Sequence, residues 1–219
     1  MTDNSTQTPN ADRPVLTAIE ARVLGCLMEK AATTPDVYPL TLNALHLACN
    51  QKTARDPIMN VEVGDAGHAL HTLQDKKFVR VEHGARSLRY AHTADAALNL
   101  TPRASAVIAL LLLRGPQTQA ELYTRSERLA AFPDPESLGD TLERLIAREP
   151  TLVVRIGRGA GQREDRYMHT LCGPVSIESL PSRAVEREPS RVEALESRIE
   201  ALEQAVAELR ASLHERAQS

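Results

Sequence analysis

The sequence predicts a mainly α-helical protein with small β-hairpins. Three observations predict this class: apolar residues recur at helical spacing, two short runs alternate like strands around a Gly-Ala turn, and one order of segments occurs twice. With 219 residues, 42% of them hydrophobic and 25% charged, the chain is long enough for two small domains with buried cores.

Composition indicates a soluble, cytoplasmic protein. Residues 1–14 are polar and lack the pattern of a signal peptide, so we expect a disordered tail. The longest apolar run, residues 106–113, is well short of the roughly 20 residues that cross a bilayer, which predicts no membrane partner. Cys26, Cys49 and Cys172 are odd in number and far apart, which suggests neither a disulfide framework nor a metal site.

The two hairpins are copies of each other. "VRVEHGARSLRYAH" (79–92) is matched by "VRIGRGAGQREDRYMH" (154–169). Upstream, "LTAIEARVLGCLMEK" from Leu16 is answered by "LTPRASAVIALLLLR" from Leu100, and "PLTLNAL" from Pro39 by "PQTQAEL" from Pro116. The order is the same in both halves, which indicates a duplicated unit of roughly 75 residues.

The first helix of each copy begins at a threonine. Thr17 is followed three residues later by Glu20, which predicts a capping box. Thr101 precedes Pro102, a residue that suits the first helical position because its missing N–H costs nothing there.

Second and third helices follow in the same order. Thr41 and Thr118 are the expected N-caps of the second helices, with Glu121 completing a capping box. The third helices carry apolar residues at 63, 66, 70 and 73 and at 138, 142, 145 and 146, and Asp134 is a strong start signal for the later one. A hairpin comes after each third helix.

Three helices followed by a two-stranded hairpin are the order of a winged helix. We therefore predict two tandem winged-helix domains, at residues 15–93 and 100–171, joined by a connector too short to let them move far apart.

The C-terminal segment follows another pattern. Residues 173–189 contain several prolines among polar residues, which predicts a flexible linker. A heptad repeat then predicts a coiled-coil helix at 190–216. β-branched residues at the first a positions and leucines at d favour a parallel homodimer; the alternative is an amphipathic helix packed on its own chain. The predicted dimerisation residues are Val192, Leu195, Ile199, Leu202, Val206 and Leu209.

The segment "NQKTARDPIMN" (50–60), taken with "TAIEARVLGCLMEK" and "VVRIGRGAGQREDRYMH", resembles the YceH-like family of uncharacterised bacterial proteins. The resemblance covers residues 15–170. It implies a fold of two tandem winged helices, in line with the repeat, and implies no particular activity. The predicted coiled coil lies outside it.

The charge of the chain restricts any nucleic-acid role to a local surface. A net charge of -3 is not that of a globally basic binder. Tryptophan is absent and aromatic residues are few, which disfavours a protein that binds single strands by stacking their unpaired bases. The third helix of the first copy is neutral, whereas that of the second has a net charge of -3 and would be repelled by phosphates.

The polar segment 50–57 has two interpretations. It is either a loop that satisfies its own backbone, with Arg55 and Asp56 paired locally, or a binding surface whose amides read base edges and whose cations meet phosphates. The hairpin arginines are likewise phosphate contacts or solvated side chains. In the second copy we favour the alternative, in which those arginines are solvated or pair with the neighbouring acidic helix.

No catalytic or metal site is indicated. His68 and His71 could share a metal, but no further ligand at suitable spacing completes a set, so solvated histidines are favoured. "GRGAG" (157–161) is a turn between strands, and no nucleophile motif occurs. We therefore expect a protein that is not an enzyme and has no cofactor.

Two hypotheses follow. The first is a dimeric protein that binds double-stranded DNA through its first winged helix, plausibly a transcriptional regulator; the alternative is a scaffold that uses both winged helices to bind protein partners. The predicted nucleic-acid-binding residues are Asn50, Gln51, Lys52, Arg55, His68, His71, Lys76, Arg80, Arg86 and Arg89.

Overall fold

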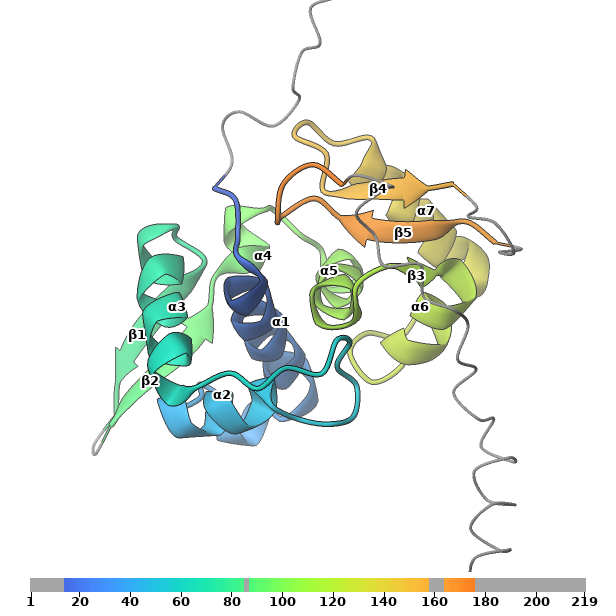
Figure 1. Cartoon of the computed structure of the whole chain (residues 1–219). Helices are drawn as coiled ribbons and strands as arrows, with labels where there is room; N and C mark the ends of the chain where they lie inside the picture. The colour runs from blue at the N-terminus through green and yellow to red at the C-terminus, as the bar shows by residue number, and fades with distance from the viewer. Residues whose placement is uncertain (1–13, 85–86, 158–163, 176–219) are drawn as a thin grey trace, which may run out of the picture. The chain divides into compact units, whose positions relative to one another are not determined.

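The computed structural model describes residues 14–84, 87–157 and 164–175 (Figure 1). Within these ranges the chain is mainly helical with small antiparallel strand pairs, as the sequence predicts. All of them belong to one compact unit, residues 1–179. The predicted linker lies almost wholly, and the coiled coil entirely, outside the described residues, as does all but the last residue of the predicted tail.

The first half contains three α-helices and a hairpin, with a 3-10 turn after the first helix. The elements are α1 (Ala18–Thr33), η1 (Pro35–Val37), α2 (Leu42–Cys49), α3 (Val63–Asp75), β1 (Val79–His83) and β2 (Leu88–His92). Both predicted N-caps are confirmed: Thr17 and Glu20 form a reciprocal capping box, and the Thr41 hydroxyl accepts a hydrogen bond from the backbone of Ala44.

The second half repeats this order after a short connecting helix. Its elements are α4 (Ala94–Ala97), α5 (Pro102–Arg114), β3 (Gln117–Thr118), α6 (Gln119–Ser126), α7 (Pro135–Ile146), β4 (Val153–Ile156) and β5 (Arg166–His169). Thr101, Thr118 and Asp134 cap α5, α6 and α7 as predicted, and Glu121 completes the capping box of α6. The sequence pattern did not predict α4 or β3.

Each hairpin receives a third backbone segment, and it does so at equivalent positions. In the second half β3 pairs with β5 through Gln117 and Tyr167, which gives the strand order β3-β5-β4. In the first half Leu40 and Tyr90 form the matching isolated bridge, with backbone hydrogen bonds of 3.1 and 2.8 Å. The two copies therefore share their strand pairing as well as their order of helices.

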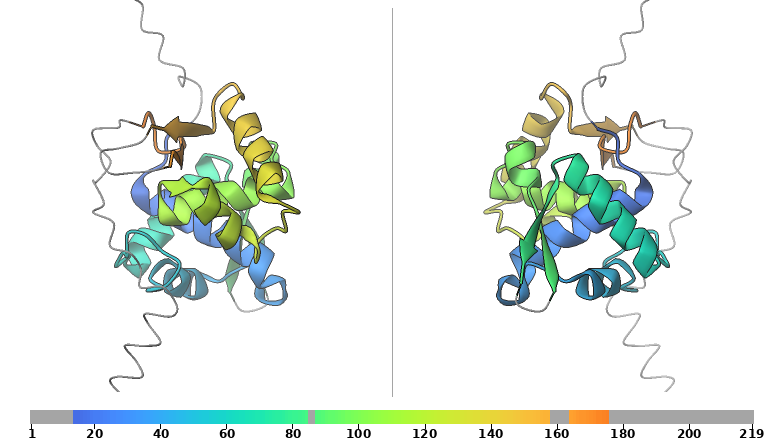
Figure 2. Two further views of the ribbon diagram at one scale, coloured as in Figure 1. Left: turned by 90° about the vertical axis from the view of Figure 1, so that its right-hand side faces the viewer. Right: turned by 90° about the vertical axis from the view of Figure 1, so that its left-hand side faces the viewer.

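The two halves meet through their first helices, α1 and α5, which lie side by side at the centre (Figures 1 and 2). Gly25 makes this approach possible, because a Cβ atom at its position would lie only 3.0 Å from Leu112 Cβ and from two atoms of Leu113. Nine residues of α5 are buried, so this helix is covered on all sides, which explains its unbroken apolar run. One hydrophobic core spans both halves.

The ends of the described unit are also joined. The backbone N–H of Leu16 donates to the carbonyl of Leu171, beyond β5, over 2.8 Å. The two copies thus share a core and a backbone contact. The domain boundaries at 15–93 and 100–171 stay a prediction.

Candidate nucleic-acid interface

The exposed face of α3 carries small and polar residues. Ala66, Leu70 and Leu73 are buried in the core, while Gly64, His68 and His71 are exposed on the other side of the helix. A Cβ atom at Gly64 would meet nothing within 4 Å, so packing does not require a glycine there. The helix therefore offers a surface on which another molecule can approach the backbone closely.

The β1–β2 hairpin follows α3 directly and lies on the same side of the molecule (Figure 2, right). Its side chains are partly used within the hairpin: Arg80 is exposed and forms an ion pair of 2.7 Å with Glu82. An exposed pair of this kind contributes little to stability, so the Arg80 guanidinium can exchange Glu82 for another anion. Arg86 lies outside the described residues.

Arg89 has a structural role that the duplication makes visible. Its guanidinium donates to the carbonyl of Pro39 over 2.7 Å. The equivalent residue of the second copy, Arg166, donates to the carbonyl of the equivalent Pro116 over 3.0 Å. Because the same bond occurs in both copies, it holds each hairpin to the segment before the second helix, whatever else Arg89 contacts.

Lys76, at the C-cap of α3, is engaged in an ion pair. Its Nζ atom contacts the two carboxylate oxygens of Glu20 at 2.9 and 2.7 Å and the carbonyl of Val15 at 2.8 Å. Glu20 is buried and also completes the capping box at the start of α1. Lys76 thus compensates a buried carboxylate, which leaves it little freedom to bind a phosphate.

The segment after α2 behaves mainly as a loop that satisfies itself. The side-chain amide of Asn50 accepts from the N–H of Val61 at 2.7 Å and donates to its carbonyl at 2.8 Å, so it closes the loop between α2 and α3. Gln51 and Lys52 are exposed, and the Gln51 amide oxygen accepts from Arg55.

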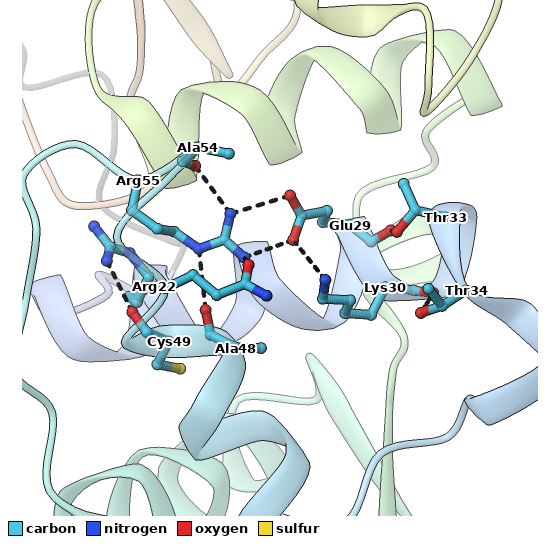
Figure 3. A network of polar contacts seen from close by, with 10 residues as sticks. Arg22, Glu29, Lys30, Thr33, Thr34, Ala48, Cys49, Ala54 and Arg55 are labelled. Atoms are coloured by element: carbon cyan, nitrogen blue, oxygen red, sulfur yellow. Dashed lines mark hydrogen bonds and ion pairs between the residues drawn. The ribbon is translucent and has the colours of Figure 1, made fainter. Parts of the chain in front are cut away.

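Arg55 is buried, so the prediction that it contacts DNA at the surface is wrong. Its guanidinium is buried and forms a bidentate pair with Glu29 of α1, at 3.0 and 2.6 Å (Figure 3). It also donates to the carbonyls of Ala48 and Ala54. Burial alone would lower the pKa of Arg55, but the hydrogen bonds that it donates to the Glu29 carboxylate raise the pKa overall, so the side chain stays charged. The carboxylate that forms this bidentate pair with Arg55 belongs to α1.

A second buried arginine supports the same loop. Arg22 donates to the carbonyls of Cys49 and Pro57, at 3.1 and 2.6 Å, and its Nε atom has no hydrogen-bond partner within the described part of the chain. Burial lowers the pKa of Arg22. Together, Arg22 and Arg55 bind four backbone carbonyls from the end of α2 and the loop that follows it.

Sequence reasoning missed Arg22 and Glu29, and it found Glu20 only as part of a capping box, not as the partner of Lys76. A signal was present in the duplication, because Arg22 and Glu29 interrupt an apolar run whose counterpart in α5 has Ala106 and Leu113. The second copy lacks both these charges and the long polar loop. The buried charges of α1 are therefore an adaptation to that loop and not a requirement of the fold.

The hairpin of the second copy agrees with the favoured interpretation. Arg155 forms an ion pair with Glu143 of the acidic helix α7. Arg166 lies 3.9 Å from Glu121. These arginines are balanced by acidic neighbours, so the second hairpin presents less free positive charge than its sequence suggests.

Two further observations concern metal binding and membrane-spanning helices. Among the described residues, no group of three or more histidine, cysteine, aspartate or glutamate side chains is arranged to hold a metal ion. None of the described helices combines the length and hydropathy that crossing a bilayer requires. The predicted dimerisation residues, from Val192 to Leu209, are outside the described ranges.

Comparison with known proteins gives consistent matches along most of the chain. Residues 16–162 match the family model described as "Protein of unknown function, DUF480". A UPF0502 protein of Stenotrophomonas maltophilia is 53% identical over 183 residues, covering 84% of this chain and 82% of that protein. A UPF0502 protein of Mesorhizobium japonicum is 53% identical over 191 residues, 84% and 91% of the two chains, and one of Azotobacter vinelandii is 51% identical over 197 residues, 87% of each.

Proposed function

This chain belongs to the DUF480 (UPF0502) family of uncharacterised bacterial proteins, and we propose that it is a non-enzymatic DNA-binding protein of two tandem winged helices. Family membership confirms the resemblance to YceH-like proteins that the sequence carries. The names of the relatives assign no activity, so the proposal depends on the residues themselves.

The winged-helix assignment is supported by the order of the elements. Each half has three helices and then an antiparallel hairpin, and the third helix leads directly into the hairpin. In proteins with this arrangement the third helix lies in the major groove of DNA and the hairpin contacts the adjoining backbone. We assign these roles to α3 and to β1–β2.

The observation that carries the DNA proposal is the surface of α3. Its exposed face has Gly64, where no packing demands a glycine, followed by the exposed His68 and His71. A helix enters a groove more deeply where its side chains are small, and imidazoles can hydrogen-bond to base edges or phosphates. Arg80 adds an exposed cation on the adjacent strand.

The proposed DNA surface is narrower than the set of residues that the sequence indicated. We retain His68, His71, Arg80 and Arg86, and we assign Arg55, Asn50 and Lys76 to the internal contacts described above. Arg89 is held by its hydrogen bond to the carbonyl of Pro39, and any contact with DNA would come in addition to that bond. Gln51 and Lys52 belong to a different surface, which they share with the last turns of α1 and α5.

The duplication provides a matched control for the DNA experiment. The test variant combines Arg80→Ala with Arg86→Ala, and the control combines Arg155→Ala with Arg158→Ala in the second hairpin, which removes the same charge. Affinity for random duplex DNA is measured as a function of salt. We expect the logarithmic salt slope of the test variant to be shallower by about 2, and that of the control to match the parent protein.

Two results would contradict the proposal. Absence of binding at low salt excludes a phosphate-contacting surface of any kind. Equal losses in the test and control variants would mean that the interaction follows total charge and not the first copy.

A scaffold function is the second candidate, and a specific observation favours it. Leu47 of α2, Ile58 of the following loop and Val63 of α3 are 68%, 64% and 43% exposed. Large exposed aliphatic side chains are typical of protein-binding surfaces. Under this alternative Leu47→Asp with Ile58→Asp abolishes binding to a protein partner without changing the salt slope for DNA.

We also propose that residues 190–216 form a parallel coiled-coil dimer. Analytical ultracentrifugation of the full chain and of a truncation after Pro189 tests this. A dimer that becomes a monomer on truncation supports it, and a monomer at micromolar concentration in both cases refutes it.

A further inference from the structure

A pocket of about 510 Å³ lies between the two halves of the described unit. It is lined by the last turns of α1 and α5, by the loop residues 51–54 and by the C-terminal part of α6. That loop is the polar segment that the second copy lacks. The pocket is within the size range of small-molecule sites, roughly 300–1,000 Å³.

The ionisable residues of this pocket are mostly cations. Its lining includes five basic and two acidic side chains, a formal excess of +3, in a chain whose net charge is -3. The basic residues are Lys30, Lys52, Arg114, Arg125 and Arg128, and the acidic ones are Glu29 and Glu127. An excess of one sign in a concave site attracts ligands of the opposite charge.

The basic side chains without a partner in the described part of the chain come from opposite halves. Glu29 is bound by Arg55 and Lys30, and Arg125 by Glu121 and Gln117. Arg114 is also engaged, and Glu127 offsets one positive charge of the lining. Lys52 and Arg128 are exposed, and neither forms a hydrogen bond or ion pair with any residue in the described ranges. They are therefore available to a ligand.

The wall of the pocket is held in place before any ligand arrives. Arg55 binds the side chain of Gln51 at 2.9 Å and the carbonyl of Ala54 at 2.9 Å, which fixes both ends of the 51–54 segment (Figure 3). The backbone N–H of Asp56 donates to the carbonyl of Leu113, in the last turn of α5, at 2.9 Å. The loop of the first copy is thus fastened to the second copy, and a prearranged site binds at a lower entropic cost.

Two of the engaged basic residues are related by the duplication. Lys30 and Arg114 occupy equivalent positions at the ends of α1 and α5, and both line the pocket. Leu110 and Leu113 also touch the pocket, but they are only 5% and 1% exposed and offer a ligand little apolar surface. The accessible lining is therefore mainly polar, with basic residues from both copies.

We propose that this pocket binds a small molecule that carries phosphate groups, with those groups on Lys52 and Arg128. Lysine and arginine bind phosphate oxygens through charge-assisted hydrogen bonds, and arginine can do so through two parallel bonds. The proposal is independent of DNA binding by α3 and would make the junction between the copies a site where a metabolite acts on the protein.

The experiment is calorimetry of the full-length protein at low salt with ADP and with inorganic pyrophosphate. The test variant is Lys52→Gln with Arg128→Gln, and the control is Lys77→Gln with Arg144→Gln, two exposed cations outside the pocket lining. We expect the dissociation constant for ADP to rise about tenfold or more in the test variant, since one lost charge-assisted contact is worth at least that factor, and to stay unchanged in the control. The dissociation constant for pyrophosphate should rise by a similar factor in the test variant, because both ligands would be held through their phosphates.

Each other result would overturn the proposal. No ADP binding at millimolar concentration excludes the site, and equal weakening in both variants assigns the effect to total charge. A test variant that binds pyrophosphate as tightly as the parent protein does excludes phosphate contacts at Lys52 and Arg128. If ADP does not bind while duplex DNA binds less well to the test variant, the cations serve DNA and not a small ligand.

Discussion

The pair between Arg55 and Glu29 gives the sharpest test of the energetics. The perturbation is Glu29→Leu, which introduces the residue that the second copy has at the equivalent position, Leu113. Leucine keeps the volume close to that of glutamate, so the change removes charge without opening a cavity. It leaves the guanidinium of Arg55, whose side chain is 0% exposed, without its carboxylate.

The expected cost is large. Removing one partner of a buried ion pair destabilises a protein by about 3–5 kcal/mol, because the remaining charge is buried without compensation. The total free energy of unfolding of a protein is about 5–15 kcal/mol, so this is a considerable share of it. For a domain of this size the unfolding midpoint should fall by roughly 6–20 °C.

Urea denaturation followed by circular dichroism measures the loss, and the exposed pair of Arg80 and Glu82 supplies the control. Glu82→Leu should change the free energy of unfolding by less than about 1 kcal/mol. The double variant Glu29→Leu with Arg55→Met should lose less than the sum of its single variants by about 0.5–3 kcal/mol, because it leaves no lone charge. If Glu29→Leu costs no more than Glu82→Leu, the reasoning is refuted, since Arg55 would then be reaching water.

Three further predictions concern single positions. Gly25→Ala should destabilise the protein by about 1–3 kcal/mol in urea titrations, because the added Cβ meets Leu112 Cβ, and an unchanged midpoint would show that α1 and α5 can separate slightly. Gly64→Ala should stabilise α3 by up to about 1 kcal/mol and yet weaken DNA binding; stabilisation without weaker binding would disprove close approach at this glycine. Burial lowers the pKa of His92, whose Nδ1 has no hydrogen-bond partner among the described residues, so stability should be complete above pH 6.5 and decline as the pH falls below it. His92→Gln should make that decline shallower in denaturation between pH 7 and 5, and an unchanged slope would mean that other groups cause it.

The elements that the sequence predicted well are those specified by local signals. Thr17, Thr101 and Thr118 cap their helices as expected, because an N-cap depends on residues only three positions away. The hairpins were equally predictable from alternation and repetition. In contrast, β3 has only two residues and is defined by its pairing with β5, a partner distant in sequence.

The candidate site was harder to predict because its polar residues act over long distances. Arg55 was expected at a surface, yet it is buried because Glu29 lies 26 residues earlier on the facing side of α1. The partners of Lys76 and Arg89 are 56 and 50 residues away. A basic residue in a polar segment has the same local signature whether it binds DNA or a buried carboxylate. Only the fold distinguishes the two.

The close contact between α1 and α5 at Gly25 has a consequence for the order in which the chain can fold on the ribosome. Chains emerge from their N-terminal end, so the first copy is synthesised before any part of α5. Until then, the surface of α1 around Gly25 and the docking point of Asp56 on Leu113 have no counterpart. The first copy must therefore wait, with apolar surface uncovered, for the second to complete it. Duplication has produced two halves that are alike in architecture but depend on each other to finish folding.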